Sequence, residues 1–440
     1  MLTSEMDKIV TFIKDFEDQQ KILNNKAPQW LKDFRKQGLT HFTQLGIPTI
    51  RDEEWKYTNI SPIVQRTYEL TFEDGQLLNT EPLERYCDPK EFNLVFVNGI
   101  FSQKLSQLKS LPQGVHISTL QEAIVSHDPE LEKLLKKYDA KSESAFVALN
   151  RALTQDGAYI KIADKVIVNK LIHIIHITNT SDKEIFSSPH TLITLGKSSE
   201  AKVLESHLAF SNEMIYFVNA LTDIFLGENA TLWYCKAQSE SLKAFHIGAT
   251  RIWEERNSNF NGFSLDLGGR IARNNLDVAL SGEGGNAILD GLYCVHGGQL
   301  VDNHTCVDHR EPNATSNQLY KGILNGASRA VFNGKIIVRP IAQKTNSYQL
   351  NKNILLGKEC LVDTKPQLEI FADDVKCTHG ATIGQLNEDE IFYLRTRAIP
   401  KRTAIKMLSR GFVDDVLQRI PDESVVRKLN QLLEPIFAAL

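Results

Sequence analysis

The sequence predicts a mainly β protein in which a β-solenoid of stacked coils lies between two helical regions. Residues 150–384 consist of short β-branched and apolar runs separated by Gly, Asn, Asp and Ser, which is typical of many short strands. A loose unit of a Gly turn, a polar step and an apolar strand recurs within this region. Helical periodicity is found instead in residues 1–149 and 385–440.

The repeated unit favours stacked coils over other all-β folds. Its copies are irregularly spaced and few hairpin dipeptides separate them, as in a solenoid and unlike a sandwich or a propeller. The copies begin at Leu195, Leu226, Ser281, Asn325 and Leu356. A large antiparallel sandwich remains the alternative.

The two flanking regions carry recognisable helix and turn signals. Phe12, Ile13 and Phe16 recur at helical spacing, and Asn98-Gly99 in "NLVFVNGIFS" predicts a tight hairpin. After residue 385, Asn387 and Glu390 form a capping-box pattern. We expect a further helix to begin at Pro400 and to end at Gly411. This helical tail is expected either to cap the solenoid or to bind a partner.

Composition argues against nucleic acid and membrane as partners. The 440 residues are 42% hydrophobic and 24% charged, with a formal net charge of −4, so no basic surface is expected for a phosphate backbone. The most apolar stretch, "VIVNKLIHIIHIT", is interrupted by Lys170, His173 and His176 and cannot span a bilayer as a helix.

We expect a cytoplasmic protein. The first twenty residues lack the basic segment and apolar run of an export signal. Six cysteines are scattered without a CxxC pair, which favours a reducing compartment over a disulfide framework.

Gly196-Lys197-Ser198 is half of a phosphate-binding loop. Thr191 stands where the loop needs a glycine that would present backbone N–H groups to phosphate. We therefore expect an ordinary turn here, and no nucleotide site.

"VDNHTCVDHRE" places metal-ligating residue types at every second position. In a strand, Asp302, His304, Cys306 and Asp308 would share one face, with His309 beside them on the other. This pattern fits a metal array. It also fits a polar ladder whose side chains satisfy one another, and we favour the ladder.

"DDVKCTHGATIG" places Cys377 and His379 on one face of a strand, followed by Gly380, which allows another backbone to approach closely. Thiolate and imidazole both suit iron or zinc, but two ligands do not complete a site. A nucleophilic Cys-His pair is disfavoured, because neighbours on one strand seldom form the required hydrogen bond. The remaining possibility is that these residues form half of a site at an interface with another subunit.

Long motifs in the chain resemble the SufB/SufD family of iron–sulfur cluster assembly proteins. They are "LGGRIARNNLDVALSGEGGNAILDGLY", "VDNHTCVDHREPNATSNQLYKGIL", "AQKTNSYQLNKNILL" and "TKPQLEIFADDVKCTHGATIGQLNEDEIFYLRTRAI", with "IPTIRDEEWKYTNI" upstream at residues 47–60. The SufD branch matches better. The SufB branch carries a cysteine where this chain has none between Ser347 and Gly357, and a glutamate at the position of Gly380.

The resemblance implies a right-handed parallel β-helix core at residues 150–384, a mostly helical N-terminal domain at 1–149 and a C-terminal helical segment at 385–440. It implies a non-enzymatic subunit that pairs with a SufB-like sister and binds a SufC-like ATPase through helices within 387–440. By the same resemblance, His379 lies at the sister interface, where a transient iron–sulfur cluster forms. Cys377 is a secondary candidate for binding the cluster, without an essential role.

The resemblance also implies a part in iron acquisition and no cofactor held stably by the chain alone. A homodimer in isolation, and a plastid stromal location after removal of a transit peptide, are compatible with it. Two other functions stay open at this point: a β-helix enzyme acting on carbohydrate, and a purely structural homodimer.

Overall fold

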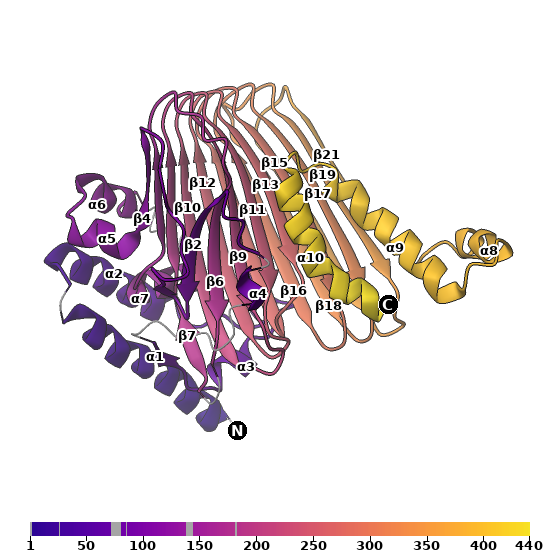
Figure 1. The fold of residues 1–440 in the computed structure, drawn as a ribbon, viewed down its shortest axis with the longest axis horizontal. Coiled ribbons are helices and arrows are strands. Elements are labelled where there is room, and N and C mark those ends of the chain that lie inside the picture. Colours follow the sequence, from indigo (N-terminus) through magenta and orange to yellow (C-terminus); the bar gives the residue numbers. More distant parts are fainter. Residues whose placement is uncertain (1, 26, 72–80, 85, 138–143, 181–182) are drawn as a thin grey trace.

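The computed structural model of the chain describes residues 2–25, 27–71, 81–84, 86–137, 144–180 and 183–440. Two stacked sheets run along one long axis, with helices around the first coils and a helical arm at the other end (Figure 1). Within these described ranges, no helix is both long and apolar enough to cross a membrane.

The strands alternate between the two sheets, as the coils of a solenoid require. Sheet A has the order β20-β18-β16-β14-β12-β10-β8-β5-β4, with β7 pairing β1 and β10 beside this path, and sheet B has the order β21-β19-β17-β15-β13-β11-β9-β6-β2-β3. From β8 onward, each strand pairs in parallel with the strand two places further along the chain, as β16 does with β18. The predicted solenoid is therefore confirmed, and the sandwich alternative is wrong.

The strand bounds follow the sequence runs closely. They are β1 (Glu69–Leu70), β2 (Phe92–Val97), β3 (Ile100–Phe101), β4 (Val115–Thr119), β5 (Ala158–Ile162), β6 (Ile172–Thr178), β7 (Ile185–Ser187), β8 (His190–Leu195), β9 (Glu200–Ala209), β10 (Tyr216–Leu226), β11 (Thr231–Ser239), β12 (Phe245–Glu254), β13 (Asn259–Asp266), β14 (Ile271–Leu280), β15 (Asn286–Val295), β16 (Leu300–His309), β17 (Thr315–Leu324), β18 (Arg329–Val338), β19 (Asn346–Leu355), β20 (Leu361–Ile370) and β21 (Lys376–Gly384).

The glycine turns stack on one another at the coil edges. A Cβ at Gly227 would lie 3.0 Å from the carbonyl oxygen of Leu195 in the preceding turn, so the close approach of the two backbones leaves little room for a side chain. Gly196-Lys197-Ser198 is one of these turns, between β8 and β9, and Lys197 Nζ pairs with Glu228 Oε2 at 2.7 Å. Strand β9 follows this turn, whereas a phosphate-binding loop is followed by a helix. The segment is therefore an ordinary turn, as predicted.

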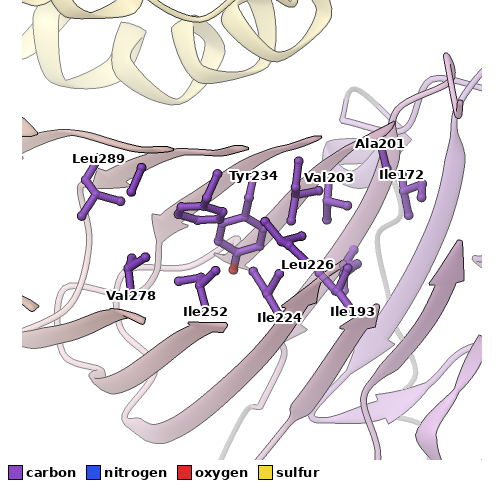
Figure 2. Packing of buried hydrophobic residues seen from close by; sticks show 14 of the residues in the cluster. Ile172, Ile193, Ala201, Val203, Ile224, Leu226, Tyr234, Ile252, Val278 and Leu289 are labelled. Carbon is purple, nitrogen blue, oxygen red and sulfur yellow. The ribbon is translucent and has the colours of Figure 1, made fainter. Parts of the chain in front are cut away.

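Part of the solenoid interior is continuously apolar. Inward-facing residues of both sheets, including Ile193, Ile224, Ile252 and Val278 of sheet A, meet Val203 and other residues of sheet B there (Figure 2). Each fully buried side chain of this kind contributes about 1.5–3 kcal/mol, so every added coil extends the core.

Helices of the first 153 residues surround the early coils. They are α1 (Leu2–Asn24), α2 (Gln29–Leu45), the 3₁₀ helix η1 (Glu53–Trp55), α3 (Ser61–Val64), α4 (Glu81–Glu84), α5 (Leu120–Val125), α6 (Pro129–Leu135) and α7 (Ala145–Leu153). Leu83 of α4 packs on the outer side of sheet B, whereas all the other helices lie on the outer face of sheet A. Phe16 and Phe146 pack there against Phe217 and Phe245 of sheet A. The predicted hairpin is confirmed: β2 and β3 are antiparallel, and Asn98 and Gly99 both have positive φ.

Three helices follow the last strand: α8 (Glu388–Thr396), α9 (Lys401–Leu417) and α10 (Glu423–Ala439). Asn387 caps α8 by accepting a hydrogen bond from the Asp389 N–H at 2.9 Å. The predicted end at Gly411 is wrong. The helix continues because Val413, Val416 and Leu417 keep its apolar face on the outer side of sheet B.

Candidate interface and metal-ligating residues

The last coil leaves both sheets open at one end. β20 pairs with β18 and β21 with β19, and within the described residues neither has a second hydrogen-bonded neighbour. An open edge of this kind presents unpaired N–H and C=O groups that another chain can bind. Large apolar side chains are exposed on and beside these strands: Leu361 (59%), Phe371 (58%), Ile383 (44%) and Ile370 (39%). We call β20, β21 and Phe371 the open end.

His379 lies on β21, in the middle of the open end. It is exposed and pairs in register with Gln349 of β19, which itself pairs with Gln318 of β17. Paired residues of parallel strands share a face, so His379 continues an inward-facing row to the mouth of the solenoid. Gln349 is 1% exposed, and neither of its amide atoms has a hydrogen-bond partner among the described residues.

Cys377 shares the face of His379 but is less accessible. It pairs in register with Ser347 and packs beside Leu368 and Val375 at the edge of a small apolar cluster. Burial raises the pKa of its thiol, so the thiolate that binds metal is a minor form at neutral pH. The predicted pair is therefore one accessible imidazole beside a half-buried thiol.

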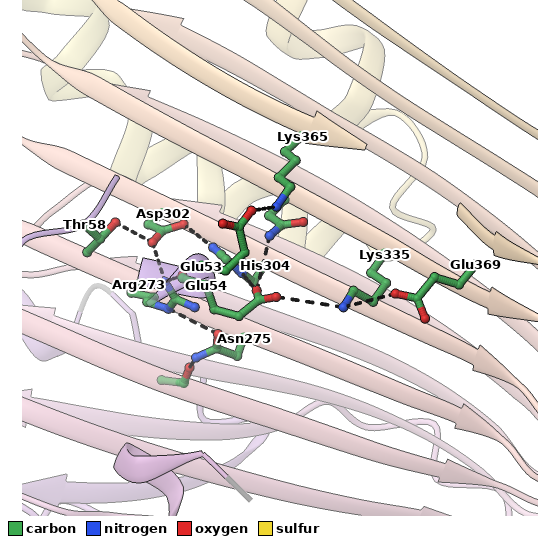
Figure 3. Close-up of polar contacts among 12 residues, drawn as sticks. Glu53, Glu54, Thr58, Arg273, Asn275, Asp302, His304, Lys335, Lys365 and Glu369 are labelled. Atoms are coloured by element: carbon green, nitrogen blue, oxygen red, sulfur yellow. Dashed lines mark hydrogen bonds and ion pairs between the residues drawn. The ribbon is translucent and has the colours of Figure 1, made fainter. Parts of the chain in front are cut away.

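The outer face of β16 carries the predicted array of Asp302, His304, Cys306 and Asp308. Asp302 accepts hydrogen bonds from Thr58 Oγ1 at 2.5 Å and from Arg273 Nη1 at 2.8 Å (Figure 3). His304 lies between Asp302 and Glu54, with nitrogen–oxygen distances of 2.9 and 3.2 Å. His309 faces inward, opposite to the array, and its Nε2 lies 2.9 Å from Ser316 Oγ.

These contacts make the array a structural ion-pair network. Burial opposes ionisation of Asp302, but Arg273 and His304 outweigh it and lower the carboxyl pKa to about 2. Asp308 is held separately by Arg310 and Arg339, both at 2.8 Å. The network fastens the N-terminal segment to sheet A, which agrees with the ladder that we favoured over a metal array.

The C-terminal helices divide into a docked part and a projecting part. α9 and α10 pack on the outer face of sheet B, where Arg419 Nε lies 2.6 Å from Asp290 Oδ2 and Lys202 Nζ 3.0 Å from Asp422 Oδ2. α8 extends away from the solenoid (Figure 1). Phe392 (65%) and Tyr393 (56%) are exposed on α8 and Met407 (50%) on the adjoining part of α9. We call α8 with Met407 the arm.

Sequence reasoning missed a third group, inside the solenoid. His176, Glu205 and His207 are all buried, and their ligand atoms lie within 4.8 Å of one another. His176 and His207 are register partners on β6 and β9. "LIHIIHIT" and "VLESHLAF" could have indicated this pairing only if the two stretches had been aligned as successive coils.

The fold and its exposed residues define an open-ended parallel β-solenoid protein with a projecting helical arm and an accessible histidine at the solenoid mouth. The family described as "SUF system FeS cluster assembly, SufBD core domain" matches residues 176–412. "SufBD protein N-terminal region" matches residues 6–174. The chain belongs to the SufBD family of iron–sulfur cluster assembly proteins.

Named relatives span nearly the whole chain. An iron–sulfur cluster assembly SufBD family protein of Synechocystis is 30% identical over 97% of this chain and 95% of its own length. The iron–sulfur cluster assembly protein SufD of Escherichia coli is 29% identical over 92% and 95%. SufD of Bacillus subtilis is 24% identical over 96% of both chains.

Proposed function

We propose that this chain is a SufD-type, non-enzymatic subunit that joins a SufB-like sister through its open end. The observation that carries the proposal is that the outer edges of β20 and β21 have no hydrogen-bonded neighbour among the described residues and lie beside exposed Leu361, Phe371 and Ile383. A sister solenoid of the same kind would cover these apolar side chains and pair the free backbone groups.

The cargo of the complex is a nascent iron–sulfur cluster at this join. A cluster is held by about four donors. This chain offers the exposed imidazole of His379, with the half-buried Cys377 as a secondary donor. The remaining donors therefore belong to the sister subunit, and the cluster is transient cargo shared between two chains. A part in iron acquisition follows from the same imidazole.

The arm is the proposed docking site for a SufC-like ATPase. Phe392 and Tyr393 of α8 are exposed aromatic side chains, a residue type enriched at protein interfaces. α9 and α10 connect the arm to sheet B, so movement of a bound ATPase would act on the solenoid through them. A cytoplasmic location is part of the proposal, and it is supported by six cysteines that form no disulfide.

Anaerobic co-expression with a SufB-like and a SufC-like subunit tests the proposal. We expect His379→Ala to leave the complex intact by size-exclusion chromatography and to lower iron and sulfide per complex. Ile383→Asp should separate this chain from the sister, because it puts a charge on the edge strand. Ile167→Asp is the matched control, since Ile167 is also an isoleucine and is more exposed (59% against 44%), but lies before β6, among the early coils.

Three outcomes would contradict the proposal. An Ile383→Asp chain that still binds the sister would remove the open end from the interface. Full iron and sulfide in the His379→Ala complex would remove His379 from the chemistry. If the chain forms a homodimer through the open end that the sister does not displace, it is a structural homodimer instead.

A further inference from the structure

Beside its apolar part, the solenoid interior also contains polar side chains. One group of them lies in the early coils, on strands β6 to β11. Glu205 of β9 receives hydrogen bonds from Thr222 of β10 at 2.8 Å and from Tyr234 of β11 at 2.6 Å. Thr191 of β8 donates to the same carboxylate at 3.1 Å. Side chains of both sheets thus converge on one carboxylate in the solenoid interior.

Two histidines complete the group. His176 Nε2 lies 3.2 Å from Glu205 Oε1, and His207 Nε2 lies 3.9 Å from the same oxygen. The two imidazole rings are stacked with centroids 4.7 Å apart. Donors of a tetrahedral ion with bonds of about 2.0–2.1 Å are separated by about 3.3–3.5 Å. The two distances to Glu205 bracket this value, and all three donor atoms lie within 4.8 Å of one another. Rotation of the stacked rings would be needed to bring the three donors onto one ion.

His207 is the independent sign that a ligand belongs here. It is 2% exposed, and neither ring nitrogen has a hydrogen-bond partner among the described residues. A buried polar group without a partner costs about 1–3 kcal/mol, and buried side chains of native proteins rarely leave both nitrogens unpaired. Ligation to a cation would give Nε2 of His207 a partner.

The surroundings of the group resemble those of a metal site. Thr191, Thr222 and Tyr234 donate hydrogen bonds to the Glu205 carboxylate and orient it, as outer-shell partners do around metals. The donor set therefore consists of two imidazoles and one carboxylate held in place from both sheets.

The neighbouring charges are already engaged elsewhere. His246 packs edge-on against His207, with ring centroids 4.9 Å apart, but it contacts Glu240 Oε2 at 2.8 Å and Lys236 Nζ at 3.0 Å. Lys236 also donates to Asn274 Oδ1 at 2.6 Å. His246 is therefore a neighbour of the group and not one of its ligands.

We infer that His176, Glu205 and His207 form an internal binding site for one divalent transition-metal ion of borderline softness, such as Zn²⁺, Co²⁺ or Fe²⁺. Two imidazoles and one carboxylate select these ions over Mg²⁺ and Ca²⁺, which prefer oxygen donors. The site is separate from His379 and goes beyond the proposed function, because it requires no partner subunit.

The test uses the full chain, expressed without partners in medium containing Zn²⁺, because so deep a site is expected to fill as the chain folds. We expect about one zinc ion per chain by elemental analysis, and X-ray absorption showing nitrogen and oxygen ligands without sulfur. His207→Phe keeps the ring volume and should lower zinc affinity at least about tenfold, the scale on which even outer-shell losses act. His173→Gln, on the outer face of the same strand β6, and His379→Ala should both keep the ion.

Three results would overturn the inference: no bound zinc in the wild type, sulfur ligands in the absorption spectrum, or undiminished zinc in a folded His207→Phe chain. If that variant does not fold, the wild type is refolded with Co²⁺, and its visible absorption and melting temperature are measured instead. Visible ligand-field bands and a raised melting temperature support the site, and their absence refutes it. Zinc loss in His207→Phe with normal cluster loading in the complex would separate this site from the one at His379.

Discussion

Arg273 and Asp302 form a buried ion pair across two neighbouring strands of sheet A, with Arg273 Nη1 2.8 Å from Asp302 Oδ2. They are register partners on β14 and β16, and 3% and 1% exposed. The Arg273 guanidinium also lies over the ring of Trp55, 3.8 Å from its centroid, and donates to the Glu54 carbonyl at 2.5 Å. One arginine therefore joins the N-terminal segment to the solenoid.

Arg273→Met should destabilise this junction strongly. It leaves the Asp302 carboxylate buried without its main counter-charge, and breaking a buried pair in this way costs about 3–5 kcal/mol. Hydrogen exchange of the backbone amides of residues 53–58 measures the loss. Arg310→Met is the control, because its partner Asp308 is also held by Arg339. Its loss of stability should be about 1 kcal/mol or less. Equal losses in the two variants would contradict the assigned role.

His304 should make the same junction sensitive to pH. Burial opposes its protonation, but Asp302 and Glu54 outweigh burial and raise the imidazole pKa. Protonated His304 therefore stabilises the fold fully below its unfolded pKa of about 6.5, and this contribution is lost as pH rises through the higher folded value. Comparing urea midpoints of wild type and His304→Gln from pH 6 to 9 should show their difference shrinking. A constant difference would show that His304 is not protonated in the fold.

The arm should contribute to binding and not to folding. Phe392→Ser and Tyr393→Ser replace exposed aromatics, so each should change the free energy of unfolding by no more than about 0.5 kcal/mol. Truncating an aromatic at the centre of an interface typically costs about 2 kcal/mol or more, so we expect an ATPase affinity loss of at least about tenfold by calorimetry. Phe210→Ser, at an exposed site on another part of the chain, controls for lost apolar surface. Unchanged affinity in both arm variants would move the docking site elsewhere.

Gly322 and Gly411 should respond oppositely to alanine. A Cβ at Gly322 would lie 2.1 Å from Cε2 of the fully buried Tyr293, so Gly322→Ala should cost about 1–3 kcal/mol through overpacking. A Cβ at Gly411 meets nothing within 4 Å and lies inside helix α9, so Gly411→Ala should add roughly 0.5–1 kcal/mol. Melting temperatures that move in the same direction would refute the packing argument.

The local pattern predicted most of the architecture. Gly turns between apolar runs indicated the coils, Asn98-Gly99 indicated a hairpin, and even spacing placed Asp302, His304, Cys306 and Asp308 on one face, all as the structure has them. These features depend on residues close together in the chain. Gly411 failed as a helix end because tertiary packing of Val413 and Val416 on sheet B outweighed the weak local preference.

By itself the sequence determined the solenoid, its helical ends, the shared face of Asp302, His304, Cys306 and Asp308 and, through its long motifs, the SufBD family. Only the tertiary structure decided which coils are neighbours. It brought His176 beside Glu205 and His207, covered Asp302 and His304 with Thr58 and Glu54, and left His379 exposed at an open edge. The physical reason is that side-chain alternation is local to a strand. Register between coils depends instead on turn lengths and on the sum of contacts between distant residues.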